Sequence, residues 1–343
     1  MTLRTYIISR ILLTIPMIFI LLTTVFLIMR VLPGDPVLLH FEKMENPAAM
    51  AAMRAALGLD KPLWVQYFNY VAGLFRGDLG KSMQDYSPVG QQIFSAFPAT
   101  FELAICSMLI AVLIGIFLGV ESSKAYNKPK DHVIRVFGIV TYAIPVFFLG
   151  MIFQLLFGVG LHWLPVGGRT YPGMEPTGLT IGTFHFSTGL YTIDSLLEGN
   201  VYKFVLTLKY LLLPSLTLGL VLCGIFIRLT RSNMFETLRL DFVTAARARG
   251  LKERTVTYSY ALRNAFLPVL TMMGLEFAML LAGAVLTETT FSWPGLGRYI
   301  VDRINFRDYT AIQGAVVVFG IFVSIASLAV DLLYAYLDPR IRL

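Results

Sequence analysis

Long runs of apolar residues alternate with shorter polar stretches along most of this chain. Six of the runs carry few or no charges near their centres, and they cover residues 8–30, 99–121, 136–157, 209–230, 265–288 and 310–336. A helix of about 20 residues is long enough to cross about 30 Å of hydrocarbon. The pattern therefore predicts an all-α, polytopic membrane protein with six transmembrane helices.

The composition agrees with a bilayer environment. Apolar residues make up 56% of the 343 residues and charged residues only 14%, whereas a soluble domain carries about 25% charged residues. The first apolar run follows Arg4 and Arg10 in the manner of a secretory signal, but it continues to about Ile28 and no small-residue cleavage site follows it. We therefore expect a retained first helix. Cys106 and Cys223 fall inside predicted spans, so no disulfide framework is indicated.

The distribution of basic residues predicts the orientation of the six spans. The side that holds both termini has 16 Lys and Arg in 67 positions, and the other side has 12 in 142 positions. Loops that stay in the cytoplasm carry the excess of positive charge, so both termini are predicted to be cytoplasmic in the inner, or cell, membrane. This bias and the attraction of anionic inner-leaflet lipids account for the net charge of +7, and no nucleic-acid partner is expected.

The spans divide the chain into three parts. Residues 1–32 form the N-terminus and first span, 33–98 an external subdomain, and 99–343 a core with five spans and the cytoplasmic segment 231–264. In the subdomain, Leu57, Trp64, Phe68 and Leu74 are spaced to line one face of short helices. Further along, we expect an irregular external loop over 158–192 and an amphipathic helix at the membrane surface over 193–208.

The sequence carries no recognisable catalytic or metal-binding motif. Its histidines are isolated from one another and from the cysteines, at positions 40, 132, 162 and 185. The stretch RGDLGKS at 76–82 ends like a phosphate-binding loop, but Phe75 stands where that loop needs its first glycine. The stretch is also predicted to face away from cytoplasmic ATP. We therefore expect neither an enzyme nor a bound cofactor.

Four carboxylic acids lie in or at the ends of predicted spans: Glu102, Glu276, Glu288 and Asp331. A charge facing lipid is costly, so each should face the bundle interior, a cavity or the membrane surface. For Glu102 and Glu288, which lie at span edges, we favour a bond to a neighbouring helix or a place at the water boundary. Glu276 and Asp331 are candidates for the polar lining of a substrate path, and packing of each carboxyl against a neighbouring helix remains the alternative.

A polar stretch, DFVTAARARGLKERT at 241–255, lies in the predicted cytoplasmic connection between two spans. Its alanines allow a short helix to approach another surface closely, and Gly250 suits the left-handed end of that helix. Its basic residues can pair with acidic groups on a partner or on lipid. An ordinary basic loop is the alternative, but a simple connection needs only a few residues and this one has about 34.

The residues Thr244 to Gly250, TAARARG, resemble the EAA-x3-G loop of ABC importer permeases, which docks on the ATPase subunit. The stretches ALRNAFLPVL at 261–270, FSWPGLGRYIVDRI at 291–304, LDPRIRL at 337–343 and the N-terminal LPGDP are similar to the B-type permease of dipeptide, oligopeptide and nickel importers. The chain departs from the general motif at Thr244, where the consensus has Glu. It also has 16 residues between Gly250 and Leu267-Pro268, where the consensus has 11.

This resemblance implies a type I ABC importer permease in which the coupling residues are Asp241, Thr244, Ala245, Ala246, Arg247, Arg249 and Gly250. It implies three kinds of protein partner: a second related permease subunit, two cytoplasmic ATPase subunits and an extracytoplasmic substrate-binding protein. Membrane lipids are a further partner, expected from the apolar spans and the basic residues. The implied substrates are di- or oligopeptides, and relatives import nickel, glutathione or oligosaccharides.

Two functions from other classes are the alternatives. An ion-coupled secondary transporter would use the intramembrane carboxylates, but it would need interrupted helices in inverted repeats and has no use for 231–264. An intramembrane enzyme would need a convergent polar site within the spans, and the sequence shows none.

Overall fold

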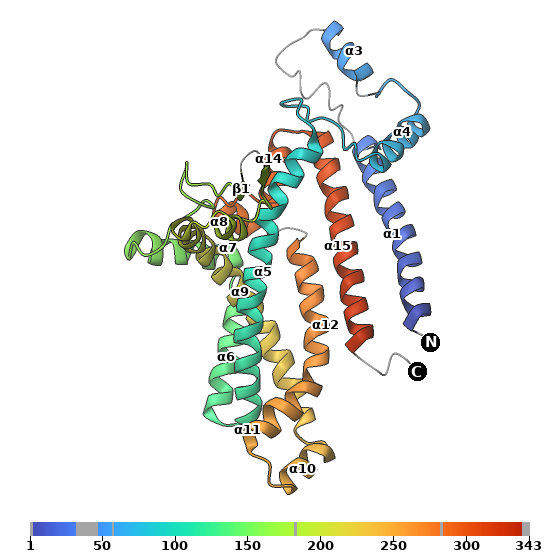
Figure 1. Ribbon diagram of the computed structural model, residues 1–343. Helices are drawn as coiled ribbons and strands as arrows, with labels where there is room; N and C mark the ends of the chain where they lie inside the picture. Colours follow the sequence, from blue (N-terminus) through green and yellow to red (C-terminus); the bar gives the residue numbers. More distant parts are fainter. Residues whose placement is uncertain (1–2, 32–46, 57, 182–183, 282–283, 338–343) are drawn as a thin grey trace.

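The computed structural model describes residues 3–31, 47–56, 58–181, 184–281 and 284–337 (Figure 1). Nearly all of the described elements are helices. In chain order they are α1 (Leu3–Val31), α3 (Pro47–Ala56), α4 (Leu63–Phe75), α5 (Val89–Lys124), α6 (Pro129–Ala143), α7 (Val146–Phe153), the π-helix η1 (Gln154–Gly160), strands β1 (Leu179–Ile181) and β2 (Phe184–Phe186), α8 (Tyr191–Leu197), α9 (Val201–Thr237), α10 (Asp241–Ala248), α11 (Glu253–Thr255), the π-helix η2 (Val256–Ala261), α12 (Leu262–Leu281), α13 (Val285–Thr290), α14 (Leu296–Asn305) and α15 (Tyr309–Leu337).

Five stretches of described helix are long and apolar enough to cross a membrane. They are Ile11–Arg30, Val89–Lys124, Val201–Thr237, Glu253–Leu281 and Tyr309–Val330. A sixth crossing is present only if α6 is counted as one span together with α7 and η1, which are continuous with each other. The break between α6 and α7 bends this segment by 100°. The polytopic helical fold predicted from the apolar runs is thus confirmed, with a third span that is not one straight helix.

The bend in the third span has a local cause. Ile144 is extended, with φ −72° and ψ 128°, and Pro145 follows it with φ −57° and ψ 129°. A residue before proline is driven out of the helical region, and proline has no N–H to continue the helical hydrogen bonds. The apolar pattern over 136–157 is continuous, so it predicts the length of this segment but not its direction.

Several element boundaries differ from the predicted ones. Helix α5 begins ten residues before the predicted span, at Val89. The expected surface helix over 193–208 is wrong, because α8 ends at Leu197 and the remaining residues begin the continuous helix α9. Within the loop expected to be irregular, β1 and β2 form an antiparallel hairpin in which Thr180 pairs with His185.

The centre of the bundle is the packing of α5 against α9. Gly115 and Gly119 of α5 lie one turn apart and face Phe226 and Thr230 of α9. A Cβ atom added at Gly115 would lie 2.3 Å from the Cβ of Phe226, so only glycine permits this approach. Helix α1 stands at the edge of the bundle, beside α15 (Figure 1).

The two ends of the bundle carry different structures. Helix α10 lies at one end, and α14 and α4 lie toward the other (Figure 1). On α4, Trp64 and Phe68 are 67% and 66% exposed, whereas Leu74 packs in a cluster with α1 and α15. The expectation that these three residues line one face is therefore wrong, because Leu74 is packed and the other two are exposed. Leu57, the fourth member of that set, lies outside the described residues.

Candidate coupling and translocation sites

Helix α10 is held against the bundle by its own apolar face. Val243 and Ala246 are buried and pack in one cluster with Val120 of α5, Val256 of η2 and Ala265 of α12. Burial of such side chains stabilises a contact by about 1–3 kcal/mol each. Helix α10 is thus seated on the ends of three other helices, and a displacement of α10 would disturb all of them.

The opposite face of α10 is exposed and carries mainly small and basic residues. The exposed members of the predicted coupling set are Asp241, Thr244, Ala245, Arg247, Arg249 and Gly250. Ala246 is the one member that faces the protein's own interior. Beside this surface Leu240 is 50% exposed and Phe242 is also exposed. These two side chains form an exposed apolar edge of the surface, which the sequence pattern did not indicate.

Gly250 ends α10 in the left-handed conformation predicted for it. Its φ is +73°, and nothing lies within 4 Å of the position a Cβ would take. The N–H of Gly250 donates to the carbonyl of Arg247, and the N–H of Leu251 donates to the carbonyl of Ala246. This is the Schellman pattern, in which a glycine satisfies the last carbonyls of a helix.

One ion pair joins α10 to α11. Arg247 donates to Glu253 through Nε at 3.2 Å and Nη2 at 2.8 Å. Both side chains are well exposed, so the pair adds at most about 1 kcal/mol. The other basic side chains of the segment, Arg249, Lys252 and Arg254, make no ion pair with a described residue. They are therefore available to acidic groups on another molecule.

A cleft of about 640 Å³ lies at this end of the bundle, between the end of α5 and the α11 and η2 segment. Lys124, Arg254 and Tyr258 contribute to its lining, together with Glu253 and Thr257. The Lys124 ammonium lies 5.8 Å from the centre of the Tyr258 ring and 2.7 Å from Glu121. Residues from two distant parts of the sequence meet here, which the sequence pattern alone did not reveal.

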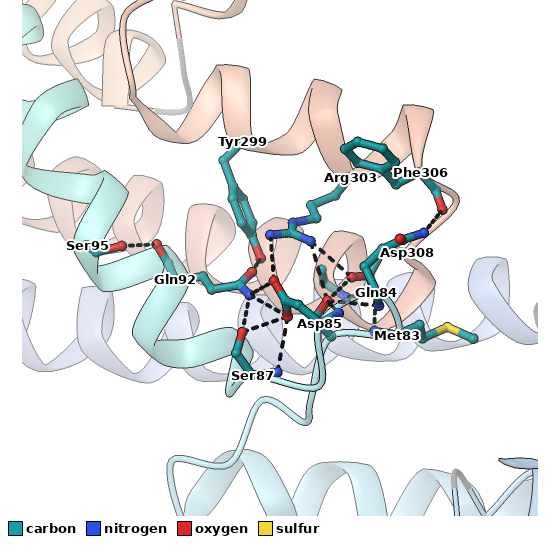
Figure 2. A network of polar contacts seen from close by, with 12 residues as sticks. Met83, Gln84, Asp85, Ser87, Gln92, Ser95, Tyr299, Arg303, Phe306 and Asp308 are labelled. Carbon is teal, nitrogen blue, oxygen red and sulfur yellow. Dashed lines mark hydrogen bonds and ion pairs between the residues drawn. The ribbon is translucent and has the colours of Figure 1, made fainter. Parts of the chain in front are cut away.

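At the other end of the bundle, Asp308 ties the start of α15 to the segment before α5 (Figure 2). Its buried carboxylate accepts hydrogen bonds from the Ser82 hydroxyl at 2.5 Å and from the N–H of Met83 at 3.1 Å. It also accepts from the N–H of Ala311, in the first turn of α15. Asp308 therefore caps α15 and anchors the segment before α5 with one side chain.

A second layer of polar contacts surrounds this anchor. Arg303 of α14 lies between two carboxylates, 3.5 Å from Asp85 and 3.6 Å from Asp308 (Figure 2). The hydroxyl and N–H of Ser87 donate to Asp85 and lower the pKa of that carboxyl to about 2. The Tyr299 hydroxyl donates to Gln92, and burial raises the pKa of Tyr299 to about 12. These residues join α14 to the start of α5.

Glu102 and Glu288 have structural partners. Glu102 receives Nε and Nη2 of Arg169, at 3.2 and 2.8 Å, and the two side chains are 3% and 6% exposed. The N–H of Thr192 also donates to Glu102. Glu288 accepts from the Thr100 hydroxyl and from the N–H of Arg298 at the start of α14. Bonding within the protein, favoured from the sequence, is confirmed for both acids, whereas Arg169 was missed because nothing marks its pairing along the chain.

The two proposed path residues differ in what is described of them. Glu276 lies on α12 and is 9% exposed, and it makes no hydrogen bond or ion pair with any residue of the described ranges. The side chain of Asp331 lies outside the described residues, although its backbone belongs to α15. Among the described residues, no three His, Cys, Asp or Glu side chains converge as the ligands of a metal ion would.

These features define a multi-pass helical membrane protein with folded polar elements at both ends. Residues 111–343 match the family model described as binding-protein-dependent transport system inner membrane component, and residues 3–104 match the model of its N-terminal part. The chain therefore belongs to this family of ABC importer permeases, which act in transport systems with other subunits.

Curated relatives match the chain over nearly its whole length. It is 39% identical over 337 residues to the dipeptide transport system permease protein DppB of Alkalihalophilus pseudofirmus, covering 98% of this chain and 99% of the relative. It is 39% identical to the di/tripeptide transport system permease protein DppB of Pseudomonas aeruginosa, covering 98% of each chain. The glutathione transport system permease protein GsiC of Pectobacterium atrosepticum is 37% identical, again over 98% of each.

Proposed function

We propose that this chain is the permease subunit of an ATP-driven importer of di- and oligopeptides. End-to-end similarity to permeases named for dipeptides and di/tripeptides supports this substrate class. Glutathione, itself a tripeptide, is the second candidate, because a glutathione permease is nearly as similar. Nickel and oligosaccharides are the other substrates that the resemblance implies.

We further propose that α10 couples the permease to an ATPase. The single observation that carries this is that α10 has one face buried against α5, η2 and α12 and the other exposed with small and basic residues. The exposed face of such a helix can bind a partner while its buried face moves together with the helices on which it packs. Coupling between two sites requires an element of this kind, which both sites can displace. ATP hydrolysis itself belongs to two partner subunits, and a second related permease completes the path.

The proposed orientation places the α10 end in the cytoplasm and the α14 end outside. The density of basic residues supports it. On this orientation the segment tied down by Asp308 and Arg303 faces the incoming binding protein. Its many internal hydrogen bonds provide a firm surface for such a partner.

Glu276 is the residue we propose for the substrate path. A buried carboxyl that has no polar partner within its own described chain is available to a cationic group that passes by, such as a peptide amino terminus. We propose the same role in the substrate path for Asp331, on the basis of its position in a predicted span alone. Unchanged transport of every tested peptide in Glu276→Gln would remove the path role and leave a packing role.

Uptake by the reconstituted importer tests the whole proposal. The complex of permeases and ATPases is placed in proteoliposomes with internal ATP, and external binding protein is supplied with labelled dipeptide, glutathione or maltose. We expect uptake of the dipeptide and little uptake of maltose. In Gly250→Val we expect ATP hydrolysis to continue without uptake, because the valine side chain strains the left-handed turn by about 1–2 kcal/mol. Uptake that needs an ion gradient and not ATP would refute the importer.

A further inference from the structure

A groove of about 400 Å³ runs between α6 and α9 in the half of the bundle nearer α10. The two helices touch at Gly138 and Gly224, where a Cβ added at Gly224 would lie 2.4 Å from the Gly138 carbonyl oxygen. The groove flanks this contact. Its chemistry is set by six of its lining side chains, which are Arg135, Ile139 and Tyr142 of α6 and Ile225, Arg228 and Arg231 of α9.

The groove changes from basic to apolar along its length. Helix α6 leads away from the α10 end and α9 leads toward it, so Arg135 and Arg231 lie at the same end. Tyr142 lies seven residues beyond Arg135, or about 10 Å further along α6. One end of the groove is therefore cationic and the other is walled by aliphatic and aromatic side chains.

The positive charge at the basic end exceeds the negative charge there. Arg231 is held by Asp131 through Nε at 2.7 Å and Nη2 at 2.8 Å. Asp131 also accepts from Ser122 and from the N–H of Asn127, so its acceptor capacity is largely taken up. Arg135 and Arg228 are exposed and make no hydrogen bond or ion pair with any residue that the structure describes.

The outer face of α6 beside the groove is suited to hydrocarbon. Ile139 is 64% exposed, and Val136 and Tyr142 are also largely exposed, although all three belong to a segment that counts toward a membrane crossing. Exposed apolar side chains on a membrane helix face lipid tails or another membrane helix. The two arginines that have no described acidic partner decide between these occupants. Arg135 directly precedes the predicted span 136–157 and Arg228 lies near the end of the predicted span 209–230, where phospholipid headgroups are expected to supply an anion.

We propose that this groove binds one anionic phospholipid, with its phosphate held by Arg135 and Arg228 and an acyl chain along Ile139 and Ile225. Guanidinium groups bind phosphate oxygens in paired hydrogen bonds, and basic pockets between membrane helices suit anionic headgroups. Arg231 is a positioning residue, because its pair with Asp131 fixes the arginine-bearing end of α9 against α6. The site shares the orientation proposed above but needs neither the peptide substrate nor the ATPase contact.

Native mass spectrometry of the assembled importer tests the site. The complex is purified in mild detergent and supplied with phosphatidylglycerol or phosphatidylcholine of the same acyl chains. We expect the wild type to retain one more phosphatidylglycerol than phosphatidylcholine per copy of this chain. Arg135→Gln combined with Arg228→Gln should lower retention of phosphatidylglycerol about tenfold or more.

Two further variants separate the charge of the groove from its shape. Ile139→Trp keeps both arginines but fills the groove, so it should also lower retention. Lys128→Gln combined with Arg263→Gln removes the same charge from exposed positions outside the lining and should leave retention unchanged.

Three outcomes would overturn the proposal. The first is equal retention of the two lipids by the wild type, and the second is equal loss in the groove and control variants. The third is displacement of the lipid by glycerol phosphate alone, which would show a site for a soluble phosphate. Because the measurement needs no uptake, its result is independent of the proposed transport function.

Discussion

Asp308 and Ser82 are 226 positions apart in the sequence and share a buried hydrogen bond of 2.5 Å. The same carboxylate accepts from the N–H groups of Met83 and Ala311. One side chain therefore joins the segment that leads into α5 to the first turn of α15 (Figure 2).

Removing this carboxylate should loosen the α14 end of the protein. Asp308→Ala leaves the Ser82 hydroxyl and two backbone N–H groups without their acceptor, and we expect a loss of about 2–4 kcal/mol in stability. Thermal unfolding of the purified complex measures the loss. Asp302→Ala, an exposed change on α14, is the matched control and should have little effect. Equal unfolding temperatures for the two variants would contradict the anchoring role.

The buried pair of Glu102 and Arg169 predicts a non-additive pair of mutations. Glu102→Gln leaves the Arg169 guanidinium buried without its carboxylate, which should cost about 3–5 kcal/mol. Changing Arg169→Gln in addition should recover part of that loss, because no unpaired charge remains. A double-mutant cycle in thermal unfolding measures the coupling. If the loss of stability in the double variant equals the sum of the losses in the two single variants, the two charges do not depend on each other.

The exposed face of α10 predicts a coupling defect without a folding defect. Ala245→Arg places a long charged side chain on the surface proposed to contact the ATPase, and we expect association to weaken about tenfold while membrane insertion stays normal. Co-purification with the ATPase is the measurement, and Ser232→Arg, an exposed change on α9, is the control. Wild-type association in Ala245→Arg would mean that the segment is only a basic connection. Ala246 is unsuitable for this test because it is buried in the permease itself.

The proposed orientation predicts which sites a membrane-impermeant thiol reagent reaches. In a chain without native cysteines, cysteine at position 60 or 175 should be labelled in intact cells, and cysteine at 252 only after the membrane is opened. Asp60, Glu175 and Lys252 are all exposed, so their accessibility depends on the side of the membrane and not on burial. Labelling at 252 and not at 60 in intact cells would invert the orientation.

The pKa of Asp85 predicts a pH dependence that lies far below neutrality. Hydrogen bonds from Ser87 lower this pKa to about 2, against about 3.9 in an unfolded chain. A lowered folded pKa gives stability that is fully present above the unfolded value and is lost as the pH falls toward the folded one. The difference in unfolding temperature between wild type and Asp85→Asn should therefore be constant from pH 8 to pH 5 and shrink only below about pH 4. A difference that shrinks already between pH 8 and 6 would assign the effect to another group.

The sequence predicted the spans because burial in a bilayer leaves a direct trace, a run of about 20 apolar residues. It predicted the end of α10 for a similar reason, since a left-handed helix end calls for glycine at position 250. Both inferences depend on neighbouring residues alone. The bend before α7 also has a local cause, at Ile144 and Pro145, but the continuous apolar pattern over 136–157 does not reveal it.

The polar anchors could not be predicted for the same physical reason. Arg169 pairs with Glu102 across 67 positions, and Asp308 reaches Ser82 from the far end of the chain. The sequence around a basic residue does not reveal whether its side chain contacts water or a carboxylate from a distant part of the chain. The expectation for α4 failed for a related reason, because Trp64 and Leu74 are both apolar and their spacing alone does not tell which of them meets α1.

The bend between α6 and α7 has a mechanical consequence. At Ile144 and Pro145 the ladder of helical hydrogen bonds is already interrupted, and the first turn of α7 donates back only to Pro145. Swinging α7 about this joint would break no helical hydrogen bond. Its stiffness is supplied by side chains, such as the Phe291 ring that lies against Gly150. A larger residue at position 150 would therefore change the preferred angle and the stiffness of the bend without breaking its backbone hydrogen bonds.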